Sequence, residues 1–460
     1  MVFSSNVFLF VFLPLTLGAY YLTPRRGRNL CLLAASLIFY GWGEPRYLAI
    51  MIFVVLLNYA GGLVLAPLRS RRSGRFALAL VIAANLAVLF YFKYTAFFLR
   101  SLNELFLLSP ALRIPKIALP IGISFYIFQS MSYSIDVYRG VVAPQRSPIK
   151  FGAYVSMFPQ LIAGPVVRYR DIAQQLEERQ ENLKQIASGV EIFIIGLGKK
   201  VLLANQVGQL WQALLGESGT LAAWVGMAAY TLQIYFDFSG YSDMAIGLGR
   251  MLGFEFLKNF DYPYISRSVT EFWRRWHISL SSWFREYVYI PLGGNRKGLA
   301  RQIFNLLVVW ALTGLWHGAS WNFVLWGLYY ALLLIAEKLF LLRAAEKLPI
   351  WLRRIGVLLA VSLGWMLFYF EDGSALCAFL SRLVRFAPLS AHTADQILGY
   401  LPILLVASLA ATPLGRRAGE ALSSRRWAGI LRLCALLAVF LLCAAELASQ
   451  SYNPFIYFRF

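Results

Sequence analysis

The sequence predicts an all-α protein that crosses a membrane many times. Hydrophobic residues make up 59% of the 460 residues and charged residues only 14%, a composition far too apolar for a soluble globule. Apolar runs of about 17–25 residues, the length that crosses a hydrocarbon core about 30 Å thick, recur from one end of the chain to the other. We therefore expect a multi-pass membrane protein.

The predicted spans follow one another with short connections. The first run is interpreted as a retained span, because Met1–Asn6 contains no Lys or Arg and so differs from the basic start of a signal peptide. In chain order the runs lie near 7–23, 29–43, 47–68, 76–99, 117–138, 186–204, 220–236, 302–316, 319–342, 351–370, 396–413 and 427–448.

Three segments depart from plain lipid-facing helices. Residues 119–140 mix Gly, Ser, Gln and Asp into an aromatic helix, and such polar atoms indicate a helix that faces the protein interior or a wet cavity. Residues 158–169 are apolar but broken by two prolines and a glycine, which favours a re-entrant or kinked segment. The charged residues 170–185 are typical of a helix on the cytoplasmic surface.

The formal net charge of +21 predicts topology rather than nucleic-acid binding. The cations lie mainly in short loops between apolar runs, where the positive-inside rule places them on the cytoplasmic side. The arginines that follow the first and third spans are Arg25, Arg26, Arg28, Arg69, Arg71, Arg72 and Arg75. We therefore expect a multi-pass protein with its N-terminus outside and, after the last span, its C-terminus outside as well.

Neither a metal nor a bound cofactor is predicted. The four cysteines, Cys31, Cys377, Cys434 and Cys443, show no CxxC spacing or Cys/His metal spacing. We interpret them as packed free thiols.

Two carboxylates, Asp237 and Asp243, lie in an otherwise apolar and aromatic setting. A buried pair of this kind is compatible with acid–base chemistry, but equally with helix capping or pairing with a nearby Arg. We assign them no catalytic role.

A basic and aromatic block at 267–301 predicts amphipathic helices at the cytoplasmic headgroup boundary. Its cations can face the phosphate of membrane lipids or of a phosphorylated acyl donor. The residues predicted for donor binding are Arg274, Arg275, Arg285 and Lys297.

Two of the three histidines are the strongest candidates for chemistry. His317 lies in the apolar run GLWHGASWNFVLWG, and His277 lies forty residues earlier in WRRWHISLSSWFREY. A proton-transferring group at membrane depth indicates function, and neutral imidazole can remove a hydroxyl proton during acyl transfer. The alternatives are a packing role for His317 and a structural role for His277. Ser320 and Asn322 are predicted to orient His317.

The motifs VTEFWRRWHISLSSWFREYVYIPLGGNRKG, TGLWHGASWNFVLWG and YFDFSGYSDMAIGLG resemble the membrane-bound O-acyltransferase family, in particular its alginate O-acetylation subunits. The resemblance implies a ring of roughly 11–13 tilted transmembrane helices, with re-entrant and amphipathic helices, around a central channel. It also implies that His317 is the catalytic histidine and His277 the second one. One domain, 1–460, would comprise N-terminal helices (1–115), a catalytic core (116–342), C-terminal helices (343–448) and an outer-face tail (449–460).

The resemblance further implies a bacterial inner-membrane enzyme that moves an acetyl group from a cytoplasmic thioester, acetyl-CoA, toward an exopolysaccharide such as alginate or a cellulose-like polymer. A periplasmic SGNH-type acetyltransferase would be its partner, and membrane lipids would surround it. The alternatives are acylation of peptidoglycan or teichoic acid, a non-enzymatic transporter of polysaccharide or lipid-linked sugar, and a structural scaffold.

The C-terminal tail, SYNPFIYFRF, resembles a short aromatic motif of the same branch. The resemblance implies that Tyr457 carries the acyl group as a relay. The alternative is an aromatic anchor at the membrane interface.

Overall fold

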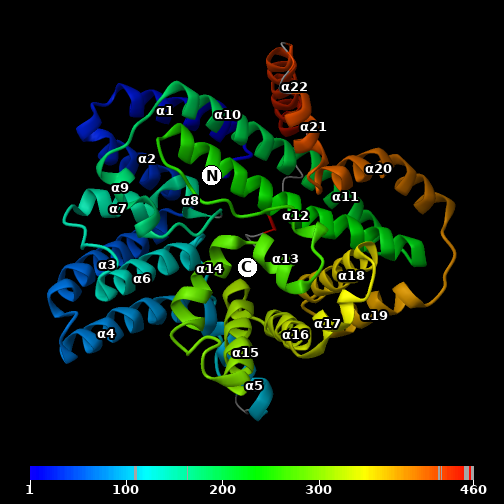
Figure 1. The fold of residues 1–460 in the computed structure, drawn as a ribbon, viewed down its shortest axis with the longest axis horizontal. Helices are drawn as coiled ribbons and strands as arrows, with labels where there is room; N and C mark the ends of the chain where they lie inside the picture. Colours follow the sequence, from blue (N-terminus) through cyan, green and yellow to red (C-terminus); the bar gives the residue numbers. More distant parts are fainter. Residues whose placement is uncertain (108–110, 163, 423–424, 426, 450–454, 457–460) are drawn as a thin grey trace. The chain divides into compact units, whose positions relative to one another are not determined.

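Every regular element in the described residues is a helix. The computed structural model describes residues 1–460 apart from 108–110, 163, 423–424, 426, 450–454 and 457–460 (Figure 1), and those it describes contain no β-strand. The predicted all-α class is confirmed. The chain divides into two compact units, Met1–Phe193 with Met244–Leu257 (unit 1) and Ile194–Asp243 with Lys258–Phe460 (unit 2).

Unit 1 contains the first nine α-helices. They are α1 (Leu13–Leu22), α2 (Arg28–Gly43), α3 (Leu48–Leu68), α4 (Arg72–Leu89), α5 (Thr95–Phe106), α6 (Ile123–Arg139), α7 (Pro148–Ser156), α8 (Phe158–Leu161) and α9 (Tyr169–Glu177). Short π-helical or 3-10 segments accompany them at Phe8–Phe12, Arg25–Gly27, Pro45–Tyr47 and Phe90–Tyr94. Two helices, α10 (Leu183–Gly198) and α12 (Thr220–Met251), belong partly to each unit.

Unit 2 contains the remaining helices. They are α11 (Asn205–Leu214), α13 (Val269–Arg275), α14 (Ile278–Phe284), α15 (Gly298–His317), α16 (Trp321–Ala336), α17 (Leu342–Glu346), α18 (Ile350–Tyr369), α19 (Gly373–Val384), α20 (Ala391–Ala410), α21 (Leu414–Leu422) and α22 (Ala428–Ser449). The π-helical segments Lys199–Ala204, Arg285–Tyr289 and Glu337–Leu341 and the 3-10 turn Pro263–Ile265 complete the unit.

The membrane-spanning character is confirmed for the described part of the chain. Seven helices there are long and apolar enough to cross a membrane, namely Pro45–Leu68, Arg72–Phe106, Gly298–His317, Trp321–Glu346, Ile350–Tyr369, Ala391–Ala410 and Ala428–Ser449. Phe8–Leu22 and Gly373–Val384 are shorter apolar helices. The other predicted spans also form helices, but these are shorter or carry polar and charged side chains. The ring and its channel stay a prediction.

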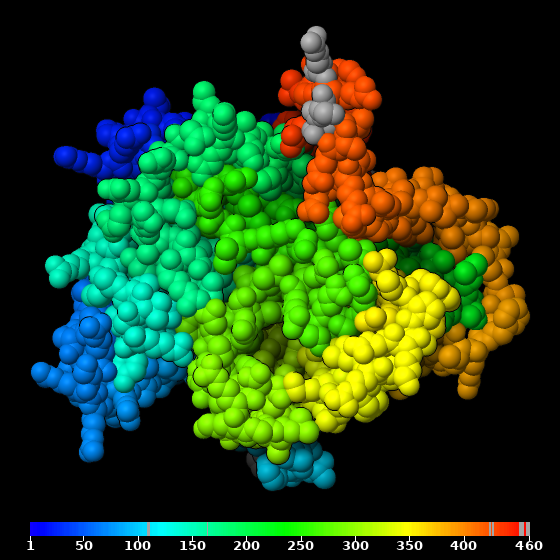
Figure 2. All heavy atoms as spheres, viewed as in Figure 1, coloured from blue at the N-terminus to red at the C-terminus, as the bar shows by residue number. Residues whose placement is uncertain are grey.

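Helix α22 shows how the apolar surface is used. Only 6% of its most apolar window is buried, and Figure 2 shows it in orange and red with much of its surface uncovered, although it packs on the segment Lys199–Ala204. Exposed side chains such as Leu433, Leu437 and Leu441 cover this helix. Such a surface is favourable only against lipid or another apolar partner.

The polar helix expected at 119–140 is α6, and nearly all of its side chains are buried. It packs beside α3 and α4, as Figure 1 shows. Asn58 of α3 exchanges side-chain hydrogen bonds of 2.9 and 3.1 Å with Asn85 of α4, and Ser134 of α6 donates to Asn58. Polar side chains that satisfy one another in this way hold apolar helices together.

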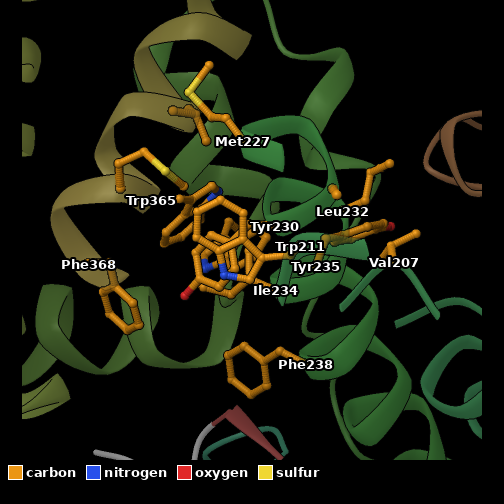
Figure 3. Close-up of a cluster of buried hydrophobic side chains, with 14 of the residues drawn as sticks. Val207, Trp211, Met227, Tyr230, Leu232, Ile234, Tyr235, Phe238, Trp365 and Phe368 are labelled. Carbon is orange, nitrogen blue, oxygen red and sulfur yellow. The ribbon is translucent and has the colours of Figure 1, made fainter. Parts of the chain in front are cut away.

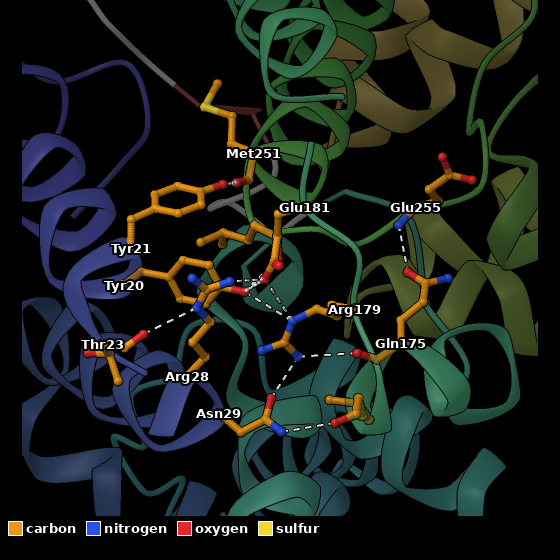
Figure 4. A network of polar contacts seen from close by, with 12 residues as sticks. Tyr20, Tyr21, Thr23, Arg28, Asn29, Gln175, Arg179, Glu181, Met251 and Glu255 are labelled. Carbon is orange, nitrogen blue, oxygen red and sulfur yellow. Dashed lines mark hydrogen bonds and ion pairs between the residues drawn. The ribbon is translucent and has the colours of Figure 1, made fainter. Parts of the chain in front are cut away.

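A second polar network fixes the connection between α9 and α10 in unit 1 (Figure 4). The Arg28 guanidinium lies 2.7 Å from Glu181, and the Tyr20 hydroxyl donates to the same carboxylate at 2.9 Å. Arg179 donates to Tyr20 and Asn29. The predicted surface helix at 170–185 is therefore interrupted, because residues 178–182 leave helical geometry to make these contacts.

Aromatic side chains form the centre of unit 2 (Figure 3). Trp211 packs on Tyr230 with ring centroids 5.4 Å apart, and Trp276 packs on Trp365 at 4.7 Å. Both pairs are tilted, with interplanar angles of 40° and 43°, and burying such large rings stabilises a fold through the area that they remove from solvent. This cluster is the rigid support on which the candidate site is built.

Candidate active site

The block predicted to be amphipathic forms two short helices with His277 between them. Ser268 caps α13 by accepting a hydrogen bond from the Glu271 backbone, and α14 begins directly after His277. His277 itself has a left-handed backbone, with φ of 45°. This conformation is uncommon for a residue other than glycine and marks local strain, which proteins often place at functional sites.

Glu337 fixes the start of α13 from another part of unit 2. Its carboxylate is buried and accepts hydrogen bonds from the backbone N–H groups of Val269 and Thr270 and from the Thr270 hydroxyl. A carboxylate at a helix N-terminus satisfies amides that have no partner within the helix. Glu337 therefore holds in place the helix that carries Arg274.

Asn259 determines which nitrogen of His277 carries the proton. The Asn259 Oδ1 atom accepts a hydrogen bond from the Ser279 backbone N–H at 3.2 Å, so this atom must be the amide oxygen. His277 Nδ1 lies 3.2 Å from the same oxygen and must therefore be the protonated nitrogen. Since burial lowers the pKa of His277 to about 3, the ring is neutral and Nε2 carries a lone pair.

Nε2 of His277 has no hydrogen-bond partner among the described residues. The side chain is only 1% exposed and lines a cavity of about 550 Å³. This volume lies within the range of small-molecule sites, about 300–1,000 Å³. A basic nitrogen at such a cavity is suited to accept a proton or to orient a bound group.

We call this cavity the large cavity. Two of the four cations predicted to bind the donor line it. Arg274 and Arg285 line it, and so does Lys338, which the sequence analysis did not single out. Arg275 instead forms ion pairs with Glu271 at 2.9 Å and Asp261 at 3.4 Å. Lys297 lies at the start of α15 and is not among the lining residues. In the sequence, Lys338 could have been recognised as a cation that follows the long apolar run of α16.

His317 is the last residue of α15 and is 5% exposed. Its ring meets those of Trp316, Trp326 and Phe368 edge to face, with centroids 5.0, 4.9 and 5.4 Å apart. Trp321, the next tryptophan along the chain, is 57% exposed. The three ring contacts come from α15, α16 and α18, so His317 is fixed where three helices meet.

His317 lines a second, small cavity of about 20 Å³, a space for roughly one water molecule. The other lining residues are Ile234, Asp237, Phe238, Trp276, Trp326, Trp365, Phe368 and Ile456.

Aromatic rings connect the two histidines. The Trp316 ring centroid lies 5.9 Å from that of His277 and 5.0 Å from that of His317. Phe238 packs on His277 at 4.6 Å and also lines the small cavity. The rings of Trp316 and Phe238, which we call the aromatic wall, thus join the histidine at the large cavity to the histidine and lining of the small one.

Ser320 and Asn322 lie on the His317 side of this wall. The Ser320 hydroxyl donates to Asn322, whose amide donates to the Phe368 carbonyl at 3.3 Å. Phe368 in turn contacts the His317 ring. This chain of contacts is compatible with the predicted orienting role, which stays a prediction.

The two carboxylates of α12 pair with lysines rather than with each other or with arginine. Asp237 Oδ1 lies 2.6 Å from Lys200 Nζ, and Asp243 Oδ2 lies 2.6 Å from Lys199 Nζ. The predicted relay residue Tyr457 lies outside the described residues. No cluster of His, Cys, Asp and Glu suited to a metal occurs in the part of the chain that the structure describes.

Residues 76–371 match the membrane-bound O-acyltransferase family, and this match covers more than half of the chain. The chain belongs to this family and is a multi-pass membrane acyltransferase. It is 42% identical to a probable alginate O-acetylase, AlgI, of Azotobacter vinelandii over the full length of both chains. It is also 34% identical to a peptidoglycan O-acetyltransferase of Helicobacter pylori, covering 74% of this chain and 70% of that one. A teichoic acid D-alanyltransferase of Bacillus subtilis is 26% identical over 48% of this chain and 59% of its own.

Proposed function

We propose that this protein transfers an acetyl group from a cytoplasmic thioester toward alginate or a related exopolysaccharide. The observation that carries the proposal is the pair of histidines, one at each of two cavities and joined by the aromatic wall. Full-length similarity to the alginate O-acetylases of Azotobacter vinelandii and Pseudomonas putida, 42% identical in each case, supports the acceptor.

The large cavity would hold the donor, acetyl-CoA. Three cations that line it, Arg274, Arg285 and Lys338, are suited to bind the phosphate groups of the donor. Its apolar lining, which includes Leu306, Val309 and Leu334, is suited to the part of the donor that carries the thioester. The sulfur-bound acetyl carbon would lie near the aromatic wall, within reach of His277.

The transfer step is a nucleophilic substitution at the acetyl carbon. A hydroxyl oxygen attacks this carbon while the imidazole of His317 removes the hydroxyl proton. The bond from carbon to sulfur then breaks, and the leaving thiolate takes up the proton that His317 removed from the hydroxyl, so that His317 becomes neutral again. His277, neutral and with a free lone pair at Nε2, would orient the donor or pass this proton. The acceptor hydroxyl at this stage would be that of Tyr457, which would then pass the acetyl group on.

The proposal also includes the location of the protein, its topology and its partner. The chain would lie in the bacterial inner membrane with both termini in the periplasm, where an SGNH-type acetyltransferase would complete transfer to the polysaccharide. Alkaline phosphatase fused to the C-terminus reports this orientation, because the enzyme is active only outside the cytoplasm. An inactive fusion that is present at normal level would contradict the proposed topology.

Substitution of the histidines tests the chemistry. His317→Ala should reduce polymer acetylation by about 10²–10⁴, the usual contribution of a positioned base, and His277→Ala should reduce it as well. His392→Ala is the matched control, because His392 is an exposed residue of α20. Acetyl content is measured by mass spectrometry and protein level by immunoblot. Full acetylation by a normally inserted His317→Ala protein would favour a transporter or a scaffold.

Peptidoglycan is the second candidate acceptor, because the relative from Helicobacter pylori is described as acting on it. Deletion of the gene followed by separate analysis of exopolysaccharide, peptidoglycan and teichoic acid distinguishes the acceptors. If only peptidoglycan loses acetyl groups, peptidoglycan is the acceptor in place of the exopolysaccharide.

A further inference from the structure

The C-terminal tail is bound to α12 through its backbone. The N–H group of Ile456 donates a hydrogen bond of 2.8 Å to Oδ2 of Asp237. One turn along α12, the ring of Tyr241 packs on that of Phe455 with centroids 4.5 Å apart. Because Asp237 and Tyr241 are four residues apart, they lie on one face of the helix. The tail is thus held by one polar and one aromatic contact.

Asp237 binds the tail with one oxygen and a lysine with the other. Its other oxygen, Oδ1, lies 2.6 Å from Lys200 Nζ, and Lys200 also donates to Asn205 at 2.9 Å. Lys200 and Asp237 are 1% and 2% exposed. A buried carboxylate is costly unless a cation pairs with it. The two oxygens therefore have separate tasks, one toward Lys200 and one toward the tail.

A glycine allows this pair to form. A Cβ atom on Gly240 would lie 2.7 Å from the Gly196 carbonyl oxygen and 3.0 Å from the Lys200 backbone nitrogen. Only glycine therefore permits α12 to approach the segment that carries Lys200 so closely.

The bound tail lies at the catalytic histidine's cavity. Ile456 and Asp237 both line the small cavity together with His317. With about 20 Å³ of space, this cavity has room for about one water and not for a sugar ring. A polymer therefore cannot reach His317 through this cavity while the tail is bound.

We propose that the Lys200–Asp237 pair is the docking site of the C-terminal tail and positions it to receive the acyl group at His317. Lys200 and Asp237 are positioning residues. The docking itself stands on the contacts above, while its role in acyl transfer rests on the proposed function.

The experiment compares two neighbouring ion pairs. The test variant is Lys200→Met with Asp237→Leu, which removes both charges and so leaves no uncompensated ion in the interior. The matched control is Lys199→Met with Asp243→Leu, because this pair joins the same segments but is 25% and 28% exposed at its side chains. Asp243 Oδ2 lies 2.6 Å from Lys199 Nζ, and Asp243 is not among the residues that line the small cavity beside Ile456.

Tail position is measured without reference to activity. The four native cysteines are replaced by serine, and Ile456→Cys introduces a single thiol whose reaction rate with a maleimide is followed in membranes. We expect labelling to become about tenfold faster in the test variant, which corresponds to the loss of one charge-assisted hydrogen bond. The control should label at the parent rate. Polymer acetylation should fall in the test variant and persist in the control.

The outcomes separate the docking proposal from the enzymatic one. Equal labelling rates in parent and test variant would overturn the docking site. Faster labelling with unchanged acetylation would overturn its positioning role. The proposed function is contradicted by a different result, full acetylation by the His317→Ala protein. That result would not change the labelling rates or what they say about tail docking.

Discussion

Asn259 should control activity through the proton position on His277. Asn259→Leu is similar in size but removes the oxygen that accepts from His277 Nδ1 at 3.2 Å and from the Ser279 hydroxyl at 2.8 Å. The imidazole is then free to carry its proton on Nε2, the nitrogen whose lone pair we expect to orient the donor or to pass a proton. Polymer acetylation should therefore fall by up to about 10²–10⁴, the contribution of a positioned acid–base group.

The same substitution also weakens the fold, and the experiment separates the two effects. Leaving the buried His277 N–H without an acceptor costs about 1–3 kcal/mol, so protein level and thermal stability are measured alongside acetylation. Ser242→Ala is the control, because Ser242 accepts from the amide nitrogen of Asn259, at 2.9 Å, and its loss leaves the Asn259 oxygen in place. It should preserve activity.

Asn259→Asp provides the pH test. A carboxylate retains an acceptor for Nδ1–H, so activity at neutral pH should recover relative to Asn259→Leu. Its negative charge raises the pKa of His277 from about 3, because it favours the protonated ring. Activity should then decline as the pH falls through the raised pKa, whereas the parent protein should keep this histidine neutral to about pH 4. An Asn259→Leu protein of normal level and full activity, or identical pH profiles for parent and Asn259→Asp, would refute the reasoning.

Three further predictions follow from the cavities, the tail and the cap of α13. Arg274→Ala and Arg285→Ala should each raise the KM for acetyl-CoA by about tenfold, the value of one charge-assisted hydrogen bond, in steady-state assays where exposed Lys297→Ala serves as control; unchanged KM values would argue against a donor site in the large cavity. Tyr457→Phe should abolish polymer acetylation without altering insertion, and normal acetyl content by mass spectrometry would make Tyr457 an anchor only. Glu337→Gln should lower the thermal stability by several degrees, because it removes the charge that accepts three hydrogen bonds at the start of α13; exposed Glu346→Gln is its comparison, and equal midpoints for the two would show that the cap adds little.

Periodicity and composition were sufficient for the helical class, because apolar length alone identifies a membrane helix. They also identified α6 as an interior helix, since its polar residues need partners. His317 was found because ionisable groups are rare in apolar runs, and His277 because the motif that contains it resembles the family. Their connection through the aromatic wall was not predictable, because it depends on the rings of Trp316 and Phe238, and aromatic residues are frequent throughout this sequence.

The partners that site residues find far away in the sequence could not be predicted either. Asn259 lies eighteen positions before His277 and Glu337 lies sixty-eight positions after Val269, so no local pattern joins them. Asp237 was noted as an unusual carboxylate, but its lysine partner is thirty-seven residues away and its tail partner more than two hundred. Arg275 looked like a donor-binding residue until the structure placed it between Glu271 and Asp261.

The aromatic wall has a consequence for the energy supply of the cell. In the proposed transfer, an acetyl group would pass this wall while sodium ions and protons, which the cell keeps at different electrochemical potentials across the membrane, would be blocked. Trp316 contacts both histidine rings and is only 3% exposed, so its side chain excludes water from the space between them. The indole would therefore act as an electrical insulator, and its truncation would be expected to cost the cell part of its proton-motive force.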